Sequence, residues 1–385
     1  MSDAVDARLF PTFDSIESVL WPGLALAVFV VTAILVDVMI ILATRWHILD
    51  LPSRRSAHSL PTARAGGVPM VATSVIASAM VCARWPDATV PVLCGLIGPA
   101  LIVAAVGFVD DIRPLRALLR LFIQIGVAVA VVAVLGPLRS VVFPGIGTLD
   151  LGPAAWPLSL VWVVGMINAY NFMDGSDGMA ATGAIVITTF LCGLGFLVGS
   201  PVLVLVPAFL GAAAAGFLVF NWAPARVFMG DVGSAYLGAA LAALALVPDG
   251  ASRAQVFLPM LMAMWPYIFD PFLTVLRRVA AGQNPLVPHR EFLFHRLVRA
   301  GWSHPSVALL YAALAVAGGL AGRLLLSDSV TPEVRRWLPF VVPVMAAGLV
   351  AYVDDHFRRS PAGALARAAA SAPRLAAAPE AAKAE

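Results

Sequence analysis

Long apolar runs separated by short polar loops dominate the pattern of this chain. A helix needs about 20 apolar residues to cross a hydrocarbon core, and about eleven runs approach that length. They lie near 21–42, 66–82, 89–109, 118–135, 154–167, 180–198, 202–220, 233–247, 255–272, 306–325 and 337–353. Several are short or interrupted by Pro and Gly, so the pattern predicts an all-α polytopic membrane protein of about 10–11 transmembrane helices.

The apolar runs divide the chain into three parts. Residues 1–20 are polar and acidic, and they lack the basic start and cleavage site of a signal peptide. Residues 21–355 form a single predicted transmembrane domain. Residues 356–385 are rich in Ala with scattered Arg and Pro, which predicts a disordered tail or a frayed surface helix.

Most of the 25 Lys and Arg residues fall in one set of loops. Basic loops remain in the cytoplasm, so this set is predicted to be cytoplasmic. The N-terminus is then outside, the C-terminus is cytoplasmic, and the protein lies in the inner (cytoplasmic) membrane. This orientation places the unusual polar motifs together on the cytoplasmic face.

Composition agrees with this class. The chain is 61% hydrophobic and 12% charged, whereas a soluble domain is about half apolar and about a quarter charged. The net charge of +3 indicates no nucleic-acid partner. The three cysteines lie in apolar runs without metal-ligand spacing, so they are predicted to be small core residues.

Five polar clusters lie on the predicted cytoplasmic face. They are the segments 50–67, 107–124, 168–178, 221–234 and 277–304. Chance can explain one such loop, but five on one face predict a composite site at the membrane–cytosol boundary. In the last segment, the apolar pattern of Phe292, Leu293 and Phe294 predicts a short interfacial helix, with His289 and Arg290 near one end and turned toward the cleft.

Carboxylates are the most informative side chains of these clusters. Asp110 and Asp111 are adjacent at the end of a span, and at about 5 Å two such charges repel by roughly 3 kcal/mol. Protonation, an Arg or a divalent cation must offset this repulsion. With Asp174, Asp177 and Asp231 on the same face, the oxygen ligands favour Mg²⁺, or Mn²⁺, shared with a substrate phosphate. The alternatives are solvated helix ends and capped interfacial turns.

Other residues of the clusters fit a phosphorylated ligand. Arginines favour bidentate phosphate contacts, although each alone also fits the positive-inside pattern. The helix start at Gly230–Ser234 favours an anion. Phe228 fits a membrane-surface aromatic and a base-stacking platform equally well. These residues indicate phosphate and magnesium chemistry without naming the reaction.

The motifs together resemble the polyprenyl-phosphate N-acetylhexosamine-1-phosphate transferases, the family of the WecA, TagO and MraY enzymes. The matching pieces are the loop Asp50–Gly67, Gly107-x-x-Asp110-Asp111, the run Asn168–Gly178 and the run Phe228–Ser234. The resemblance implies a Mg²⁺-dependent enzyme in the bilayer. It would transfer a sugar 1-phosphate from a UDP-N-acetylhexosamine donor to a polyprenyl phosphate acceptor, such as undecaprenyl phosphate, and release UMP.

The resemblance also implies roles for individual residues. The expected catalytic residues are Asp110, Asp111 and Asp231, with the aspartate pair at the lipid phosphate. The expected metal ligands are Asp231 and Asn171. The expected substrate-binding residues are Asn168, Asp174, Asp177, Asn221, Phe228, His289, Arg290, Arg54, Arg55, His58 and His295. The favoured mechanism is one-step attack by the lipid phosphate, and a phospho-aspartyl route is the alternative.

The fifth cluster departs from the family, whose members carry a His-rich run there. Here Phe292 stands where a second His is expected. The departure favours initiation of a lipid-linked envelope glycan such as O-antigen over the alternative, the phospho-N-acetylmuramoyl-pentapeptide transferase of peptidoglycan synthesis. A secondary transporter is the rival from another class. It would need ionisable residues near mid-membrane, whereas only Asp37 and Asp270 fall within apolar runs, toward their cytoplasmic ends. The transferred sugar and the oligomeric state, with a homodimer as one candidate, are left open.

Overall fold

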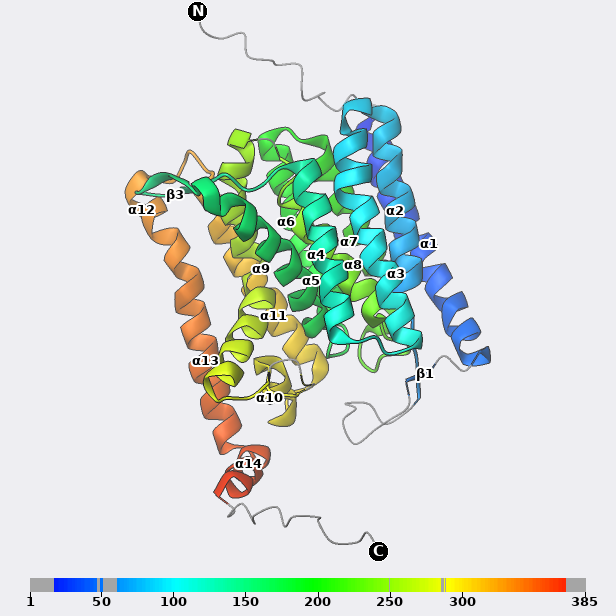
Figure 1. Cartoon of the computed structure of the whole chain (residues 1–385), viewed down its shortest axis with the longest axis vertical. Helices are drawn as coiled ribbons and strands as arrows, with labels where there is room; N and C mark the ends of the chain where they lie inside the picture. The colour runs from blue at the N-terminus through cyan, green and yellow to red at the C-terminus, as the bar shows by residue number, and fades with distance from the viewer. Residues whose placement is uncertain are drawn as a thin grey trace, which may run out of the picture.

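The computed structural model describes residues 17–46, 49–50, 61–248, 250–284, 287 and 289–371. Helices dominate this part of the chain (Figure 1). They are α1 (Glu17–Arg45), α2 (Gly67–Arg84), α3 (Gly98–Ile112), α4 (Ala117–Leu135), α5 (Ala155–Met173), α6 (Met179–Val198), α7 (Pro201–Asn221), α8 (Gly230–Leu244), α9 (Gly250–Ala280), α10 (Leu293–Arg299), α11 (His304–Leu325), α12 (Pro332–Trp337), α13 (Val341–Arg359) and α14 (Pro361–Ser371). Within the described residues, ten helical segments are long and apolar enough to cross a membrane. The prediction of an all-α polytopic membrane protein is therefore confirmed.

The predicted span at 233–247 corresponds to α8, which is not among those ten segments. At 15 residues, and about 1.5 Å per residue, α8 is shorter than a hydrocarbon core of about 30 Å. It lies inside the bundle against α2, α3 and α5, and every residue from Val232 to Leu244 is buried. Since protein rather than lipid surrounds α8, its length does not have to match the bilayer.

Glycines bring α3 and α8 into close backbone contact. A Cβ at Gly107 would overlap the backbone of Asp231 and Val232. The end of α3 therefore lies directly on the first turn of α8, which only glycine permits. This contact brings Asp110 and Asp111 to Asp231.

Helices at the rim of the bundle expose apolar faces, as lipid contact requires. Only 17% of an 18-residue apolar stretch is buried in Val19–Arg45, which lies in α1, and in Pro332–Arg359, which contains α13. Figure 1 shows α1 and α13 at opposite margins of the bundle. Interior helices are more deeply buried, and in α7 the buried share of such a stretch is 72%. The apolar sequence of the chain thus serves both a protein core and a lipid surface.

The polar clusters gather at one end of the bundle, the lower end in Figure 1, where β1 (Leu49–Asp50) and α10 lie. There β1 pairs antiparallel with β2 (Thr62–Ala63), and Ala63 also bridges to Val227. The opposite end carries α12 and a hairpin of β3 (Ser140–Phe143) and β4 (Gly147–Asp150), in which Ser140 faces Asp150. The apolar pattern had not predicted either strand pair.

Helical residues continue past the predicted domain end at 355, through α13 to Arg359 and then through α14. Residues 372–385 lie outside the described part of the chain, as do residues 1–16. The orientation of the two termini across the membrane stays a prediction.

Candidate active site

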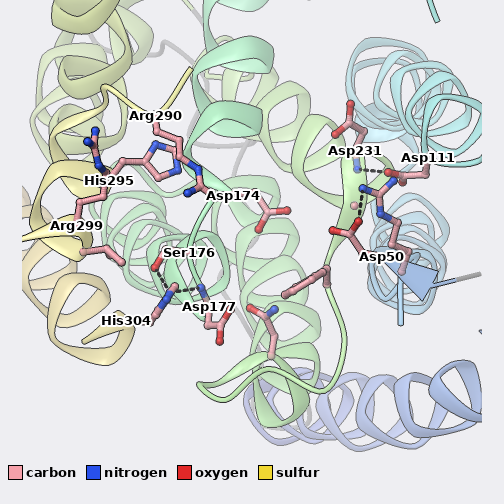
Figure 2. A pocket seen from close by; sticks show the side chains of 16 residues that line it. Asp50, Asp111, Asp174, Ser176, Asp177, Asp231, Arg290, His295, Arg299 and His304 are labelled. Atoms are coloured by element: carbon pink, nitrogen blue, oxygen red, sulfur yellow. Dashed lines mark hydrogen bonds and ion pairs between the residues drawn. The ribbon is translucent and has the colours of Figure 1, made fainter. Parts of the chain in front are cut away.

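A polar cavity of about 360 Å³ opens at the end of the bundle that carries the motifs. All five polar clusters contribute to its wall, so these distant segments do meet in space. The lining residues are Asp50, Arg64, Asp111, Asp174, Gly175, Ser176, Asp177, Asn221, Phe228, Gly230, Asp231, Arg290, His295, Val298, Arg299 and His304. In Figure 2, basic side chains from the α10 region stand on one side of the cavity, and the carboxylates of Asp50, Asp111 and Asp231 stand on the other.

Asp231 lies in the first turn of α8, where two other polar groups reach its carboxylate. Its Oδ2 is 3.2 Å from Nη1 of Arg120, and the same Nη1 also contacts the carboxylate of Asp110. The amide of Asn171, which donates to the hydroxyl of Ser234 at 2.9 Å, lies next to this carboxylate. One guanidinium thus stands between two carboxylates, which marks this position as favourable for a cation.

The neighbouring aspartates hold backbone N–H groups. Asp111 accepts hydrogen bonds from the N–H of Asp231 at 3.0 Å and of Val232 at 3.2 Å, so it caps the start of α8. Asp110 accepts from the N–H of Leu115 at 2.6 Å in addition to Arg120. Asp111 lines the polar cavity, whereas Asp110 lies outside its wall. The adjacent pair is therefore structurally asymmetric.

The turn between α5 and α6 places Asp174 and Asp177 in the cavity. Gly178, with φ of +75°, allows the chain to reverse into α6. Burial, and then the nearby carboxylates of Asp231, Asp111 and Asp177, raise the pKa of Asp174 well above its usual range. An electropositive ligand in the cavity would favour the ionised form of this side chain.

Asn221 joins this turn to the loop after α7. Its Oδ1 accepts from the N–H of Gly178 at 3.0 Å, and its Nδ2 donates to the carbonyl of Val227 at 2.9 Å. The carboxylate of Asp177 accepts from the N–H of Ala225 at 3.1 Å in the same loop. Asn221 and Asp177 thus hold two walls of the cavity together, in addition to lining it.

The basic wall comes from α10 and the residues on either side of it. His295 and Arg299 are one helical turn apart on α10, and Arg290 precedes the helix. Burial, and then the charge of Arg290, lower the pKa of His295 to about 3, so its imidazole is neutral at physiological pH. Within the described structure, Nδ1 of His295 is buried and has no hydrogen-bond partner.

His289 and Arg290 line different cavities, although the sequence predicts that both turn toward one cleft. Arg290 lines the polar cavity, but His289 lines a second cavity of about 470 Å³ together with Phe292. Between these two rings the centroid distance is 4.7 Å. Burial, and then the charge of Arg278, lower the pKa of His289.

The second cavity is mostly apolar and lies among α3, α4, α5 and α9. Its apolar lining includes Val103, Val106, Leu118, Leu121, Ile123, Phe172, Val275 and Phe292. Arg120, Gln124, Asn168, Asn171 and Asp231 add polar groups to its wall. Among the described residues, Asp231 is the only one that lines both cavities. The two cavities therefore meet at this carboxylate.

The donor atoms around Asp231 fit a magnesium ion that has few protein ligands. No group of three His, Cys, Asp or Glu side chains among the described residues forms a preassembled metal cluster. The oxygens of Asp231, Asp110 and Asn171 are nevertheless hard ligands at the position that Arg120 marks as favourable for a cation. Such a set would require substrate oxygens or water to complete the coordination.

Three expected substrate-binding residues, Arg54, Arg55 and His58, lie outside the described residues. Lining or bridging residues without a role in the sequence-based site include Arg120, Ser176, Arg299 and His304. The hydroxyl of Ser176 lies 2.8 Å from Nδ1 of His304. Helical spacing from His295 could have indicated Arg299, but the pairing of Ser176 with a residue 128 positions away has no local signal.

Comparison with known proteins gives a consistent set of matches. The model of the family "Glycosyl transferase family 4" matches residues 93–249. The chain is 32% identical over 268 residues to the probable undecaprenyl-phosphate N-acetylglucosaminyl 1-phosphate transferase of Bacillus subtilis, over 68% of this chain and 73% of that protein. It is 33% identical over 299 residues to the decaprenyl-phosphate N-acetylglucosaminephosphotransferase of Mycolicibacterium smegmatis, over 70% and 73% of the two chains. A phospho-N-acetylmuramoyl-pentapeptide-transferase of a Synechococcus strain is 40% identical over 200 residues, which cover 49% of this chain and 56% of that protein.

Proposed function

This chain belongs to glycosyl transferase family 4, the family of the polyprenyl-phosphate sugar-1-phosphate transferases, and we propose that it transfers N-acetylhexosamine 1-phosphate from a UDP-sugar to a polyprenyl phosphate. The observation that carries the proposal is the meeting of a polar and an apolar cavity at Asp231. A reaction between a water-soluble nucleotide sugar and a lipid phosphate needs such a junction. The names of the relatives support N-acetylglucosamine as the sugar.

The polar cavity is the donor site. Arg290 and Arg299 offer planar guanidinium groups to the diphosphate. Phe228 lines the same cavity and offers a ring for the uracil. Ser176 and Asp177 lie beside His304, on the same side of the cavity as Arg299, where their oxygens are able to hydrogen bond to base or ribose. These contacts orient the β-phosphorus toward Asp231.

The apolar cavity is the acceptor site. Its aliphatic and aromatic lining favours a prenyl chain, and Arg120 offers a positive charge to the phosphate at its head. Asn168 donates to the side-chain carbonyl of Gln124 at 2.7 Å, which fixes the polar end of this cavity. His289 lies on the same wall, so we assign it to the acceptor rather than to the donor.

The reaction is a direct phosphoryl transfer. An oxygen of the acceptor phosphate forms a bond to the β-phosphorus, and the bond from that phosphorus to the bridging oxygen breaks, so UMP leaves with this oxygen. Asp231, Asn171 and Asp110 would hold a Mg²⁺ ion, which when bound would neutralise charge on the diphosphate. Arg120, Arg290 and Arg299 orient the two phosphorylated substrates and offset their mutual repulsion.

The chain does not need to provide a strong base. The second pKa of a phosphate monoester is about 6, so the acceptor is mostly ionised at neutral pH. The oxygens of Asp110 and Asp111 accept backbone and guanidinium hydrogen bonds, which suits structural support rather than proton transfer. A secondary transporter fits less well, because Asp270, a carboxylate within a span, is fully buried and lines neither of these two cavities.

Purified protein in lipid nanodiscs, with Mg²⁺, undecaprenyl phosphate and UDP-N-acetylglucosamine labelled in the sugar, tests the proposal. We expect labelled lipid and UMP in equal amounts. Asp231→Asn, which keeps the size of the side chain and removes its charge, should lower turnover by about a thousandfold or more while the protein stays folded. Absence of labelled lipid with every UDP-N-acetylhexosamine, including the muramoyl-pentapeptide donor, would refute the activity.

A further inference from the structure

Asp270 in α9 is a buried carboxylate that neither substrate cavity uses. Its side chain is 0% exposed, and it is absent from the walls of both cavities. An ionisable group within a membrane-spanning helix is costly unless it has specific partners. The partners of Asp270 therefore indicate what it does.

Four donors converge on the two oxygens of Asp270. Oδ1 accepts from the N–H of Leu293 at 2.7 Å and from the hydroxyl of Thr274 at 3.3 Å. Oδ2 accepts from the N–H of Phe294 at 3.1 Å and from the hydroxyl of Tyr311 at 2.7 Å. Four is the number of hydrogen bonds that an ionised carboxylate can accept. Three helices, α9, α10 and α11, thus meet at one side chain.

The start of α10 depends on this support from another helix. α10 has only seven residues, and its N-cap, Phe292, has no side-chain oxygen to accept hydrogen bonds from the first N–H groups. So short a helix is not stable alone, and unpaired N–H groups at its start are costly when buried. Asp270 fills the role of the missing cap and fixes the start of α10 relative to α9.

The position of α10 in turn sets the basic wall of the donor cavity. His295 and Arg299 line this cavity from α10. A Cβ at Gly175 would come within 2.9 Å of the Phe294 ring and 3.0 Å of Nε2 of His295, so α10 packs directly on the turn between α5 and α6. A small rotation of α10 would therefore redirect both cavity-lining side chains.

A second anchor holds the other side of α10. Asp354 of α13 accepts hydrogen bonds from Arg296 of α10 and from Arg277 of α9. This contact restrains the middle of α10, whereas Asp270 holds its first two N–H groups. Loss of Asp270 alone should therefore loosen the start of α10 without detaching the helix.

We infer that Asp270 is a positioning residue for the donor site, which fixes the start of α10 and thereby directs His295 and Arg299 toward the nucleotide sugar. The inference rests on the proposed function, because the effect on a substrate presupposes that the polar cavity binds the UDP-sugar. Its effect should appear in the KM for the donor and not in the KM for the lipid acceptor.

Asp270→Asn tests this inference, since the amide keeps the size of the side chain but replaces one accepting oxygen by a donor. We expect the KM for UDP-N-acetylglucosamine to rise about tenfold, because a change of this size corresponds to the loss of one charge-assisted hydrogen bond. The KM for undecaprenyl phosphate should stay within about twofold. Amide hydrogen exchange at 293–299, measured without substrates, should become faster.

Ser159→Ala is the matched control. Its buried hydroxyl accepts from the N–H of Leu138 at 2.8 Å, at the start of α5 and far from the cavities. This variant should lower the Tm and leave both KM values unchanged. If Asp270→Asn does not fold, Tyr311→Phe keeps the carboxylate and its backbone bonds, and it should raise the donor KM about threefold.

Two results would overturn the inference. One is faster exchange at α10 with an unchanged donor KM. The other is unchanged exchange at α10, which is decisive even if the wild-type protein transfers no sugar phosphate, because exchange needs no substrate. The experiment therefore distinguishes a wild-type protein without the proposed activity from an Asp270 without the proposed role.

Discussion

At the scale of single residues, neighbours in the sequence line different cavities. Helical or loop spacing could show that His289 and Arg290 lie near the cleft, but not that they face different cavities. The division depends on tilted ring contacts, of His289 with Phe292 at 4.7 Å and of Phe292 with Phe172 at 5.6 Å. Local sequence does not specify such contacts, because they arise from packing between α5 and the segment before α10.

Substitutions of Arg290 and of His289 should therefore change the KM of different substrates in steady-state kinetics. Arg290→Lys loses the bidentate geometry, so we expect the KM for the UDP-sugar to rise about tenfold with little change in the lipid KM. His289→Ala should do the reverse and raise the lipid KM. The measurement varies each substrate in turn, and a shift of the same KM in both variants would rule out two separate sites at these residues.

His295 should make stability depend on pH. Its pKa is about 3 in the folded protein and about 6.5 in an unfolded chain. The unfolded state therefore binds a proton between these values that the folded state does not, so stability is lost as the pH falls below about 6.5. Thermal unfolding from pH 7 to pH 5 should show a smaller fall in Tm for His295→Gln than for wild type. Parallel curves for the two proteins would show that His295 does not contribute.

At the scale of elements, the apolar pattern predicts the helices well because each run must satisfy its own backbone in the membrane. The expected short helix after Arg290 is confirmed as α10. The β3–β4 hairpin was not predicted, since β4 is wholly exposed and carries no alternating apolar pattern. The exact start of α8 could not be predicted from the sequence either. Asp111 of α3 determines this start by accepting hydrogen bonds from the N–H groups of Asp231 and Val232.

The end of α4 shows how a side chain from another helix stabilises an element. Arg253 of α9 donates to the carbonyls of Leu135 at 2.6 Å and Gly136 at 3.0 Å, and also to Pro248 at 2.8 Å. Lys cannot reproduce this fork of donors at the negative end of a helix. Arg253→Lys should lower the Tm by several degrees and leave both KM values unchanged. A changed donor KM would link this end of the bundle to the active site.

At the scale of the whole molecule, the sequence indicated that five polar clusters share one face, and the cavity lining brings all five together. It did not indicate two cavities, because the boundary between them is made by side chains from α3, α5, α8 and the segment before α10. A linear pattern shows on which end of the bundle a residue lies. It does not show which neighbour the residue meets there.

The orientation of the molecule in the membrane is open to direct measurement. In a background without Cys82, Cys94 and Cys192, a cysteine at Arg113, which is exposed at the motif-bearing end, should resist a membrane-impermeant thiol reagent in intact cells. A cysteine at Ile146, 80% exposed at the tip of the hairpin, should react. Permeabilised cells, in which both should react, provide the control. The opposite labelling pattern would place the polar cavity outside the cell.

The proposed reaction joins a lipid phosphate and a nucleotide sugar at Asp231, with cleavage at the β-phosphorus. Two preparations of UDP-N-acetylglucosamine, one with ³²P in the α-phosphate and one with ³²P in the β-phosphate, test it most directly. With purified protein, Mg²⁺ and undecaprenyl phosphate, we predict that the β label enters the lipid and the α label remains in UMP. Transfer of the sugar without the β label, or of both labels together, would contradict the account.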